Sequence, residues 1–162
     1  MFELLRSLSI DAVAGRATGE AFIPAGHPLF ADHFPAHATL PGTLAMELAA
    51  QVAGPLAEEV TPLRHGGRER YAVLGMIRHA KFLRAVPLPA RLALEAEVRR
   101  SDPSQVTVAV AARVEEVLVL RGELVLAMIE MTEMTEPASE WSAALALRDQ
   151  RVARWKQAGE AR

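Results

Sequence analysis

The chain has 162 residues, of which 51% are hydrophobic, a length and composition that suit one globular domain with a sizeable core. Its formal net charge of −2 leaves no basic excess for nucleic acid or an anionic membrane, and no apolar run approaches the roughly 18 residues of a membrane span. Cysteine is absent, which excludes disulfides, a cysteine nucleophile and cysteine-based zinc sites and favours a reducing cytoplasm.

The N-terminal part of the chain predicts two short strands. The first eight residues are weakly amphipathic and predict either a short helix or a lead-in, and the charges of Glu3 and Arg6 argue against a signal peptide. The segments Ser9–Ala14 and Ala17–Ile23 follow as strands on either side of a turn at Gly15-Arg16.

A central helix is predicted from about Gly42 to Val60. Its residues from Leu44 to Ala53 are apolar on almost every side, which is typical of a buried helix. Thr43, Glu47 and Gln51 interrupt this pattern, and at 100° per residue they share one stripe about 80° wide. A buried carboxylate is costly unless it is paired, protonated or functional, so Glu47 is a candidate site residue.

Proline punctuates the second half of this helix. Pro55 cannot donate to the carbonyl of Gln51, so we expect the helix to kink or end there. The segment Thr61–Arg70 contains a further proline and two glycines and predicts a polar loop.

The region after this loop predicts an antiparallel sheet, because apolar and polar residues alternate along it. Glu115-Glu116 fits either a bulge or a turn, and both readings stay open. Arg121-Gly122 predicts a hairpin turn. The expected strands are Tyr71–Val86, Arg91–Ser101, Val106–Ala112, Val117–Leu120 and Glu123–Met131.

A last helix is predicted at Ser139–Gln157, with Ser139 as its candidate N-cap. We expect it to cover the sheet or a neighbouring subunit. One face of this helix is apolar, and it consists of Trp141, Leu145, Val152 and Trp155.

The loop before the central helix carries a histidine. His33 lies in a segment that Pro35 and Pro41 keep from being helical throughout. A loop histidine and the helix residue Glu47 form a plausible acid–base pair. Gly42 begins the helix, where unpaired N–H groups and the positive end of the helix dipole could stabilise an oxyanion.

These residues form a continuous motif: His-Phe-Pro at 33–35, Pro41-Gly42, and Leu-x-x-Glu-Leu-x-x-Gln at 44–51. The motif resembles that of the 3-hydroxyacyl-acyl carrier protein dehydratases, with every spacing matched. Three residues depart from the family pattern, namely Asp32, Ala38 and Leu48. The resemblance implies an α+β hotdog fold, an antiparallel sheet wrapped around a long central helix, over residues 1–136, with 137–162 as an additional helical extension.

The activity that the resemblance implies is removal of water from a 3-hydroxyacyl thioester to give the trans-2-enoyl thioester. His33 would be the base at C2, and Glu47 would donate a proton to the departing hydroxyl. The N–H of Gly42 would hold the thioester oxygen, Gln51 would orient Glu47, and Tyr71 is a candidate gate of the acyl tunnel. This elimination requires no metal and no redox cofactor.

The resemblance also implies partners. Sites of this family combine the His and the Glu of different subunits, so we expect a homodimer, with a hexamer of three dimers as a further option. The substrate would arrive on acyl carrier protein, in fatty acid synthesis or in related polyketide or aryl-polyene synthesis. An acidic carrier would meet a basic region made of Arg64, Arg68, Arg70, Arg78, Lys81 and Arg84.

Two other functions remain open at this point. One is a sister hotdog enzyme, either a thioesterase or a dehydratase that also isomerises the double bond. The isomerising relatives typically carry Asp at the position of Glu47, which counts against that branch. The other is a non-catalytic hotdog protein that binds acyl chains or acts as a scaffold, and the presence of both His33 and Glu47 argues against it.

Overall fold

The computed structural model describes residues 4–26, 30, 33–34, 37–130 and 138–161, without the side chains of 138–140. These residues form six strands and two helices. The elements are β1 (Leu5–Asp11), β2 (Arg16–Ile23), α1 (Gly42–His65), β3 (Tyr71–Phe82), β4 (Ala90–Asp102), β5 (Gln105–Val114), β6 (Val117–Ile129) and α2 (Ala138–Glu160).

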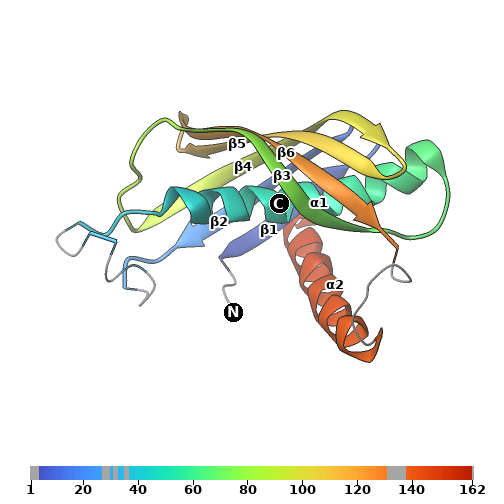
Figure 1. The fold of residues 1–162 in the computed structure, drawn as a ribbon. Coiled ribbons are helices and arrows are strands. Elements are labelled where there is room, and N and C mark those ends of the chain that lie inside the picture. Colours follow the sequence, from blue (N-terminus) through green and yellow to red (C-terminus); the bar gives the residue numbers. More distant parts are fainter. Residues whose placement is uncertain (1–3, 27–29, 31–32, 35–36, 131–137, 162) are drawn as a thin grey trace.

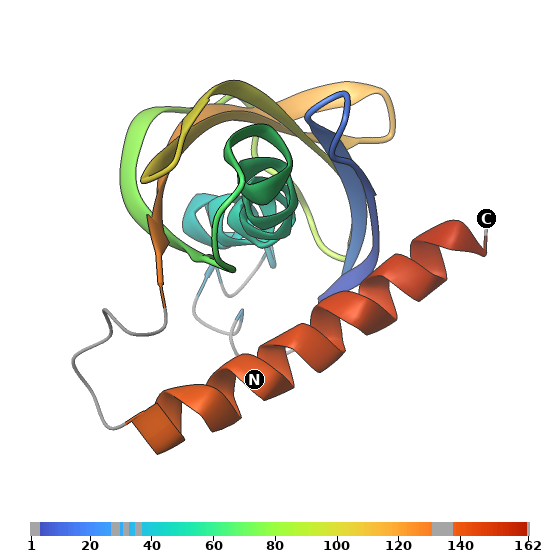
Figure 2. The same cartoon turned by 90° about the vertical axis from the view of Figure 1, so that its right-hand side faces the viewer.

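The six strands form one sheet in the order β1-β2-β4-β5-β6-β3, and every neighbouring pair is antiparallel. The sheet curves around α1, which Figure 2 shows almost end-on inside the arc of strands. Figure 1 shows the same helix from the side, lying along the sheet. The predicted α+β architecture, a hotdog fold with an additional C-terminal helix, is confirmed.

The core lies between the inner face of the sheet and α1. On β4, Leu92, Leu94 and Ala96 are buried and alternate with exposed residues, as a half-buried strand requires. On α1, Val52 and Leu56 are fully buried. Each buried side chain of this size contributes about 1.5–3 kcal/mol, so this contact holds the first half of α1 against the sheet.

The helix α1 passes through Pro55 and Pro62 and ends only at His65, so the prediction that it could end at Pro55 is wrong. The predicted loop Thr61–Arg70 is correspondingly shorter. Gly54 and Pro55 are both buried, and burial of the helix offsets the hydrogen bond that Pro55 cannot make. Packing against the sheet therefore outweighs the local proline signal.

The hairpin predicted at Arg121-Gly122 is also wrong, because β6 runs through it without interruption. The turn is at Glu115-Glu116, where Glu115 has a φ of 52°. Gly122 serves packing instead: a Cβ there would stand 2.7 Å from the His79 carbonyl oxygen and 3.0 Å from Met46 Cε. Glycine at 122 thus lets the neighbouring strand and α1 approach β6.

The two edge strands differ from their predicted bounds. β1 begins at Leu5, in a stretch that was predicted as a helix or lead-in, and it pairs with β2. β3 ends at Phe82, four residues before its predicted end at Val86. β3 forms one edge of the sheet, and its residues are exposed from Val73 onward.

The helix α2 crosses the open side of the wrapped sheet (Figure 2). Its predicted apolar face is buried at Leu145 and Trp155, whereas Trp141 is 38% exposed. Glycine at 159 permits close packing on β1, because a Cβ there would collide with the carbonyl oxygen of Leu8. The helix begins at Ala138, one residue before the predicted cap. The predicted domain boundary at residue 136 lies outside the described residues.

Candidate active site

The loop that carries His33 is attached to the segment after β3. The N–H of Leu40 donates to the Val86 carbonyl at 2.9 Å, and that of Leu88 donates to the Ala38 carbonyl at 2.9 Å. Thr39 forms an isolated antiparallel bridge with Pro87. These contacts fix the described part of the loop at the N-terminal end of α1. The motif residues Asp32 and Pro35 lie outside the described residues.

The imidazole of His33 is oriented by the backbone of its own loop. Its Nδ1 lies 2.9 Å from the carbonyl oxygen of Thr39. Because a carbonyl can only accept, Nδ1 carries a proton, so in the neutral ring the lone pair is on Nε2. The N–H of Thr39 donates to the His33 carbonyl at 3.2 Å, which closes the turn. This arrangement leaves Nε2 as the basic nitrogen of the ring.

The first turn of α1 begins at Gly42, and no side chain caps it. A Cβ on Gly42 would stand 2.7 Å from a carbon of the Phe82 ring. The predicted reason for glycine here was access of a ligand to its N–H. The structure adds a second reason, because the ring of Phe82 occupies the space in which a side chain would stand.

Glu47 and Gln51 lie one turn apart on α1 and are joined. Gln51 Nε2 donates to Glu47 Oε1 at 3.0 Å. Glu47 is exposed in the single chain, so the prediction that its carboxylate is buried is wrong for the single chain. Glu47 and Gln51 face a hollow that residues of β3, β6 and α2 also line. Gln51 Oε1 is buried and has no hydrogen-bond partner among the described residues.

Glu47 lines a groove of about 300 Å³. Its walls come from four elements: α1, β3, β6 and α2. Apart from Glu47, Gln51 and two arginines of α2, the lining is apolar or small, and it includes Ala50 and Gly54 of α1 and Ala72 and Leu74 of β3. An apolar groove with a carboxylate at its side suits a chain-like substrate that carries one reacting polar group.

His33 and Glu47 do not meet within one chain. The described contacts of the imidazole are with its own loop, and the described hydrogen bond of Glu47 is with Gln51. Neither His33 nor Gly42 lines the groove beside Glu47. The structure therefore brings Glu47 and Gln51 together and leaves His33 on a separate element.

Tyr71, the candidate gate, lines a different cleft of about 810 Å³ between the second half of α1 and α2. The guanidinium carbon of Arg148 lies 5.7 Å from the centre of its ring. Partial burial, followed by the nearby Asp149 carboxylate, raises the pKa of the Tyr71 phenol. These contacts place Tyr71 beside α2 and outside the lining of the groove of Glu47, although Pro55, Arg148 and Val152 line both hollows.

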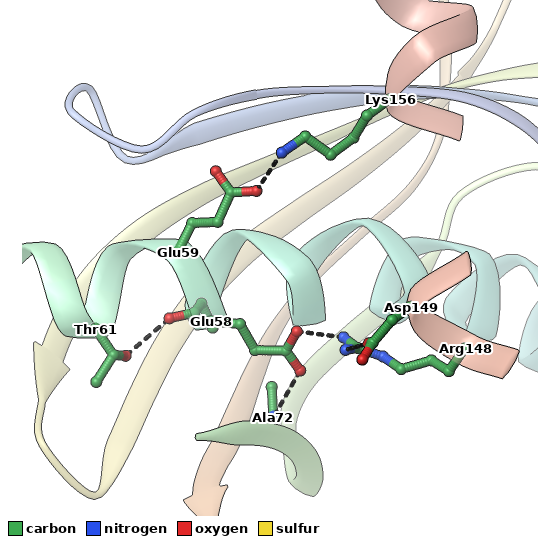
Figure 3. A network of polar contacts seen from close by, with 8 residues as sticks. Glu58, Glu59, Thr61, Ala72, Arg148, Asp149 and Lys156 are labelled. Carbon is green, nitrogen blue, oxygen red and sulfur yellow. Dashed lines mark hydrogen bonds and ion pairs between the residues drawn. The ribbon is translucent and has the colours of Figure 1, made fainter. Parts of the chain in front are cut away.

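A network of ion pairs joins α1 to α2, and the sequence analysis did not anticipate it (Figure 3). Glu58 accepts a hydrogen bond from the Ala72 N–H at 2.8 Å and is paired with Arg148. Glu59 is paired with Lys156 at 2.7 Å. The signal available in the sequence was the adjacent Glu58-Glu59 in an otherwise apolar helix.

Burial governs the ionisation of this network. Burial raises the pKa of the Glu58 carboxyl, although Arg148 and the Ala72 N–H oppose the shift. Arg148 also donates to Asp149 at 2.8 Å. The pair is thus a partly desolvated contact that fixes α2 against α1.

The six basic residues predicted as one region do not lie together. Arg64 is in the last turn of α1, and Arg78 on β3 pairs with Glu123 at 3.4 Å. The other four lie in two groups at the two ends of β3. Arg68 and Arg70 precede β3 and pair with Glu130, at 3.8 and 3.0 Å. Lys81 and Arg84 lie at the other end of β3, roughly 35 Å away at 3.3 Å per residue, and they have no ion pair among the described residues. The second group lies at the end of β3 that adjoins the His33 loop.

The described residues contain no group of three His, Asp or Glu side chains that could hold a metal ion. Neither α1 nor the described part of α2 has a stretch long and apolar enough to cross a bilayer.

Comparison with known proteins defines the family. The sequence model of the FabA-like domain matches residues 4–128 of the chain. The chain belongs to the FabA-like family. The 3-hydroxyacyl-[acyl-carrier-protein] dehydratase FabZ of Chlamydia pneumoniae is 32% identical over 123 residues, which cover 76% of this chain and 79% of that protein. FabZ of Clostridioides difficile is 29% identical over 129 residues, which cover 80% and 88%.

Solved structures agree with a FabA-like fold. The smu.793 protein of Streptococcus mutans, bound to acetyl CoA, matches with a TM-score of 0.61 at 13% identity, covering 79% of this chain and 90% of that one. A thioesterase of Haemophilus influenzae, HI1161, matches with a TM-score of 0.56 at 18% identity, covering 75% and 76%. At these identities the likeness shows the fold alone.

Proposed function

We propose that this FabA-like protein is a hydro-lyase that removes water from a 3-hydroxyacyl thioester carried on acyl carrier protein, giving the trans-2-enoyl thioester. Two observations together support the proposal. The chain is FabA-like and similar to curated FabZ dehydratases. It also presents His33, whose Nε2 can act as a base, and Glu47, which lines a small apolar groove. Fatty acid synthesis is the process to which such a dehydration belongs, and polyketide or aryl-polyene synthesis is a narrower alternative.

The proposed reaction requires one base and one acid. Nε2 of His33 takes the proton from C2, and the electron pair left on C2 becomes the C2=C3 double bond as the C3–O bond breaks. Glu47, in its protonated form, gives its proton to the departing hydroxyl, which leaves as water. The N–H of Gly42 stabilises the negative charge on the thioester oxygen during this step. Proton exchange with solvent then restores the two side chains.

Gln51 acts on the substrate only through Glu47. Its amide N–H holds Oε1 of the carboxylate at 3.0 Å, which restricts rotation of Glu47 and leaves the other carboxyl oxygen for the substrate. We therefore assign Gln51 as a positioning residue.

A homodimer completes the proposed site. β3 is an edge strand, and its exposed apolar residues Val73, Met76 and Ile77 would be covered by β3 of a second copy. A two-fold pairing of this kind would bring the His33 of one subunit to the Glu47 of the other, which agrees with the lack of contact between them in one chain. Three such dimers could form a hexamer.

The carrier protein would approach the end of β3 that adjoins the His33 loop. Lys81 and Arg84 are exposed there and form no ion pair within the described part of the chain, so these two cations suit an acidic partner. The predicted contribution of Arg68 and Arg70 is weaker, because both are paired with Glu130 at the opposite end of the strand.

The test is a single assay with three readouts. The purified protein is incubated with a 3-hydroxyacyl carrier protein, and enoyl absorbance, release of free thiol and thermal stability are recorded. Enoyl formation is the expected result. Thiol release without enoyl formation would identify a thioesterase, and stabilisation by acyl ligands without turnover would identify a non-catalytic acyl-binding protein; either outcome contradicts the proposal.

A further inference from the structure

The groove beside Glu47 has one wall that lies outside the family match. The FabA-like match ends at residue 128, whereas α2 begins at Ala138. Arg148, Arg151, Val152 and Trp155 of this helix nevertheless line the groove together with Glu47. The groove is thus lined partly by residues of the FabA-like match and partly by α2, which lies outside that match.

The lining residues of α2 form one face of the helix. Positions 148, 151, 152 and 155 are spaced by three, four and seven residues, which places them on one side. Trp155 is only 9% exposed and packs into the core, and Val152 packs against the same core. The two apolar residues therefore present fixed, bulky groups to the groove.

The walls opposite α2 combine small residues with the larger Pro55, Leu74 and Leu126. Ala50 and Gly54 of α1 and Ala72 of β3 line the groove, and the position where a Cβ of Gly54 would stand is 4.0 Å from Ala72 Cβ. The small residues of α1 and β3 leave space beside Glu47. On the side of α2, this space is bounded by Val152 and Trp155.

Several contacts hold α2 in this position. Arg148 pairs with Glu58, Lys156 pairs with Glu59 at 2.7 Å, and Gly159 packs against the backbone of Leu8. Figure 3 shows the two ion pairs reaching from α2 to adjacent positions of α1. The contacts lie on both sides of Val152 and Trp155 in the sequence, so these two residues cannot move away from the groove without breaking them.

We propose that α2 closes the acyl-chain groove beside Glu47, and that Trp155 and Val152 set the longest acyl chain that the enzyme accepts. This inference rests on the proposed function. The groove volume of about 300 Å³ is at the lower end of the range for small-molecule sites, which favours short to medium acyl chains. An acyl chain too long for the groove would have to displace the Trp155 indole from the core. One methylene can change kcat/KM by about tenfold or more in such a site.

The experiment compares chain-length profiles. For wild type, Trp155→Ala and Val152→Phe, kcat/KM is measured on 3-hydroxyacyl pantetheine thioesters that differ in steps of two carbons. Trp155→Ala should raise kcat/KM for the long chains relative to the short ones by on the order of tenfold or more. Val152→Phe should change the same ratio in the opposite direction. Trp141→Ala, on an exposed part of the same helix and outside the groove lining, should leave the profile unchanged.

The outcomes separate this inference from the proposed function. If the wild type dehydrates none of the thioesters, the proposed function fails first. If it is active but Trp155→Ala and Val152→Phe share the wild-type profile, α2 does not limit the chain and the inference is overturned. Circular dichroism and thermal unfolding establish that each variant is folded; should Trp155→Ala be unfolded, the shift of Val152→Phe toward shorter chains decides alone.

Discussion

Gln51 holds Glu47 by a 3.0 Å hydrogen bond between residues one helical turn apart on α1. The bond holds one carboxyl oxygen and leaves the other free to meet a substrate. Gln51 Oε1 is buried without a partner among the described residues, so the bond to Glu47 is the side-chain contact described for this amide. The orientation of the Glu47 carboxyl therefore depends on Gln51.

This relationship predicts different kinetics for the two residues. Glu47→Gln removes the proton donor, and kcat should fall by about 10²–10⁴-fold. Gln51→Ala leaves the carboxyl in place but free to rotate, so kcat should fall by about 10–100-fold with KM little changed. Steady-state kinetics on a 3-hydroxyacyl thioester measure both. An equal loss in both variants would show that Gln51 does more than position Glu47.

A cross-subunit site predicts rescue between two inactive variants. His33→Ala and Glu47→Gln each remove one member of every site, so each homodimer should be inactive. In a randomly mixed dimer population about half of the dimers are mixed, and each mixed dimer has one site with both residues intact. Activity should therefore recover to about one quarter of the wild-type value per chain. Absence of recovery, with mixed dimers demonstrated by mass spectrometry, would place both residues in the same chain.

The sequence predicted those features of the fold that depend on local pattern. Leu92 and Leu94 alternate with polar or small residues, and they are buried on β4, as the predicted half-buried strand requires. The spacing from His33 to Gln51 indicated the family that the comparisons confirm. Both signals are contained in short stretches of chain, so neither depends on what packs against them.

The errors arose where a distant contact decides the structure. Gly122 resembled a turn residue, but its lack of a side chain is required by Met46 and by the His79 carbonyl, which are far away in the sequence. Pro55 resembled a helix end, but burial against the sheet carries α1 through it. Glu47 was predicted to be buried, but its side chain is exposed in the single chain. Such contacts cannot be read from a local pattern.

The close approach of Gly42 and Phe82 predicts a steric coupling. In Gly42→Ala the new Cβ would meet the ring at 2.7 Å, so the ring must move. We expect a loss of about 1–2 kcal/mol in the free energy of unfolding, less than for a buried clash because Phe82 is half exposed. Urea denaturation measures the loss. The same substitution in a Phe82→Ala background should cost less, and equal costs in both backgrounds would show that the ring is not what excludes a side chain.

The Glu58–Arg148 pair predicts a pH-dependent contribution of α2 to stability. Burial raises the pKa of Glu58 above its ordinary value of 4.5, so the folded state holds this proton more tightly than the unfolded state. The stabilising effect of the protonated carboxyl is complete below 4.5, and it is lost as the pH rises through the folded-state pKa. Arg148 limits this loss, because it compensates the carboxylate charge.

Removing Arg148 should therefore destabilise the fold mainly at neutral pH. Arg148→Ala leaves a partly buried carboxylate without its cation, and we expect a cost of about 1–3 kcal/mol at pH 7, below the figure for a fully buried pair because Arg148 is 31% exposed. The cost should shrink toward pH 4, where Glu58 is protonated. Thermal unfolding across this range measures it. In the Glu58→Gln background the buried carboxylate is gone and the exposed Asp149 remains as a partner of Arg148, so Arg148→Ala should show a smaller cost with a weaker pH dependence. An unchanged pH dependence would assign the effect to another group.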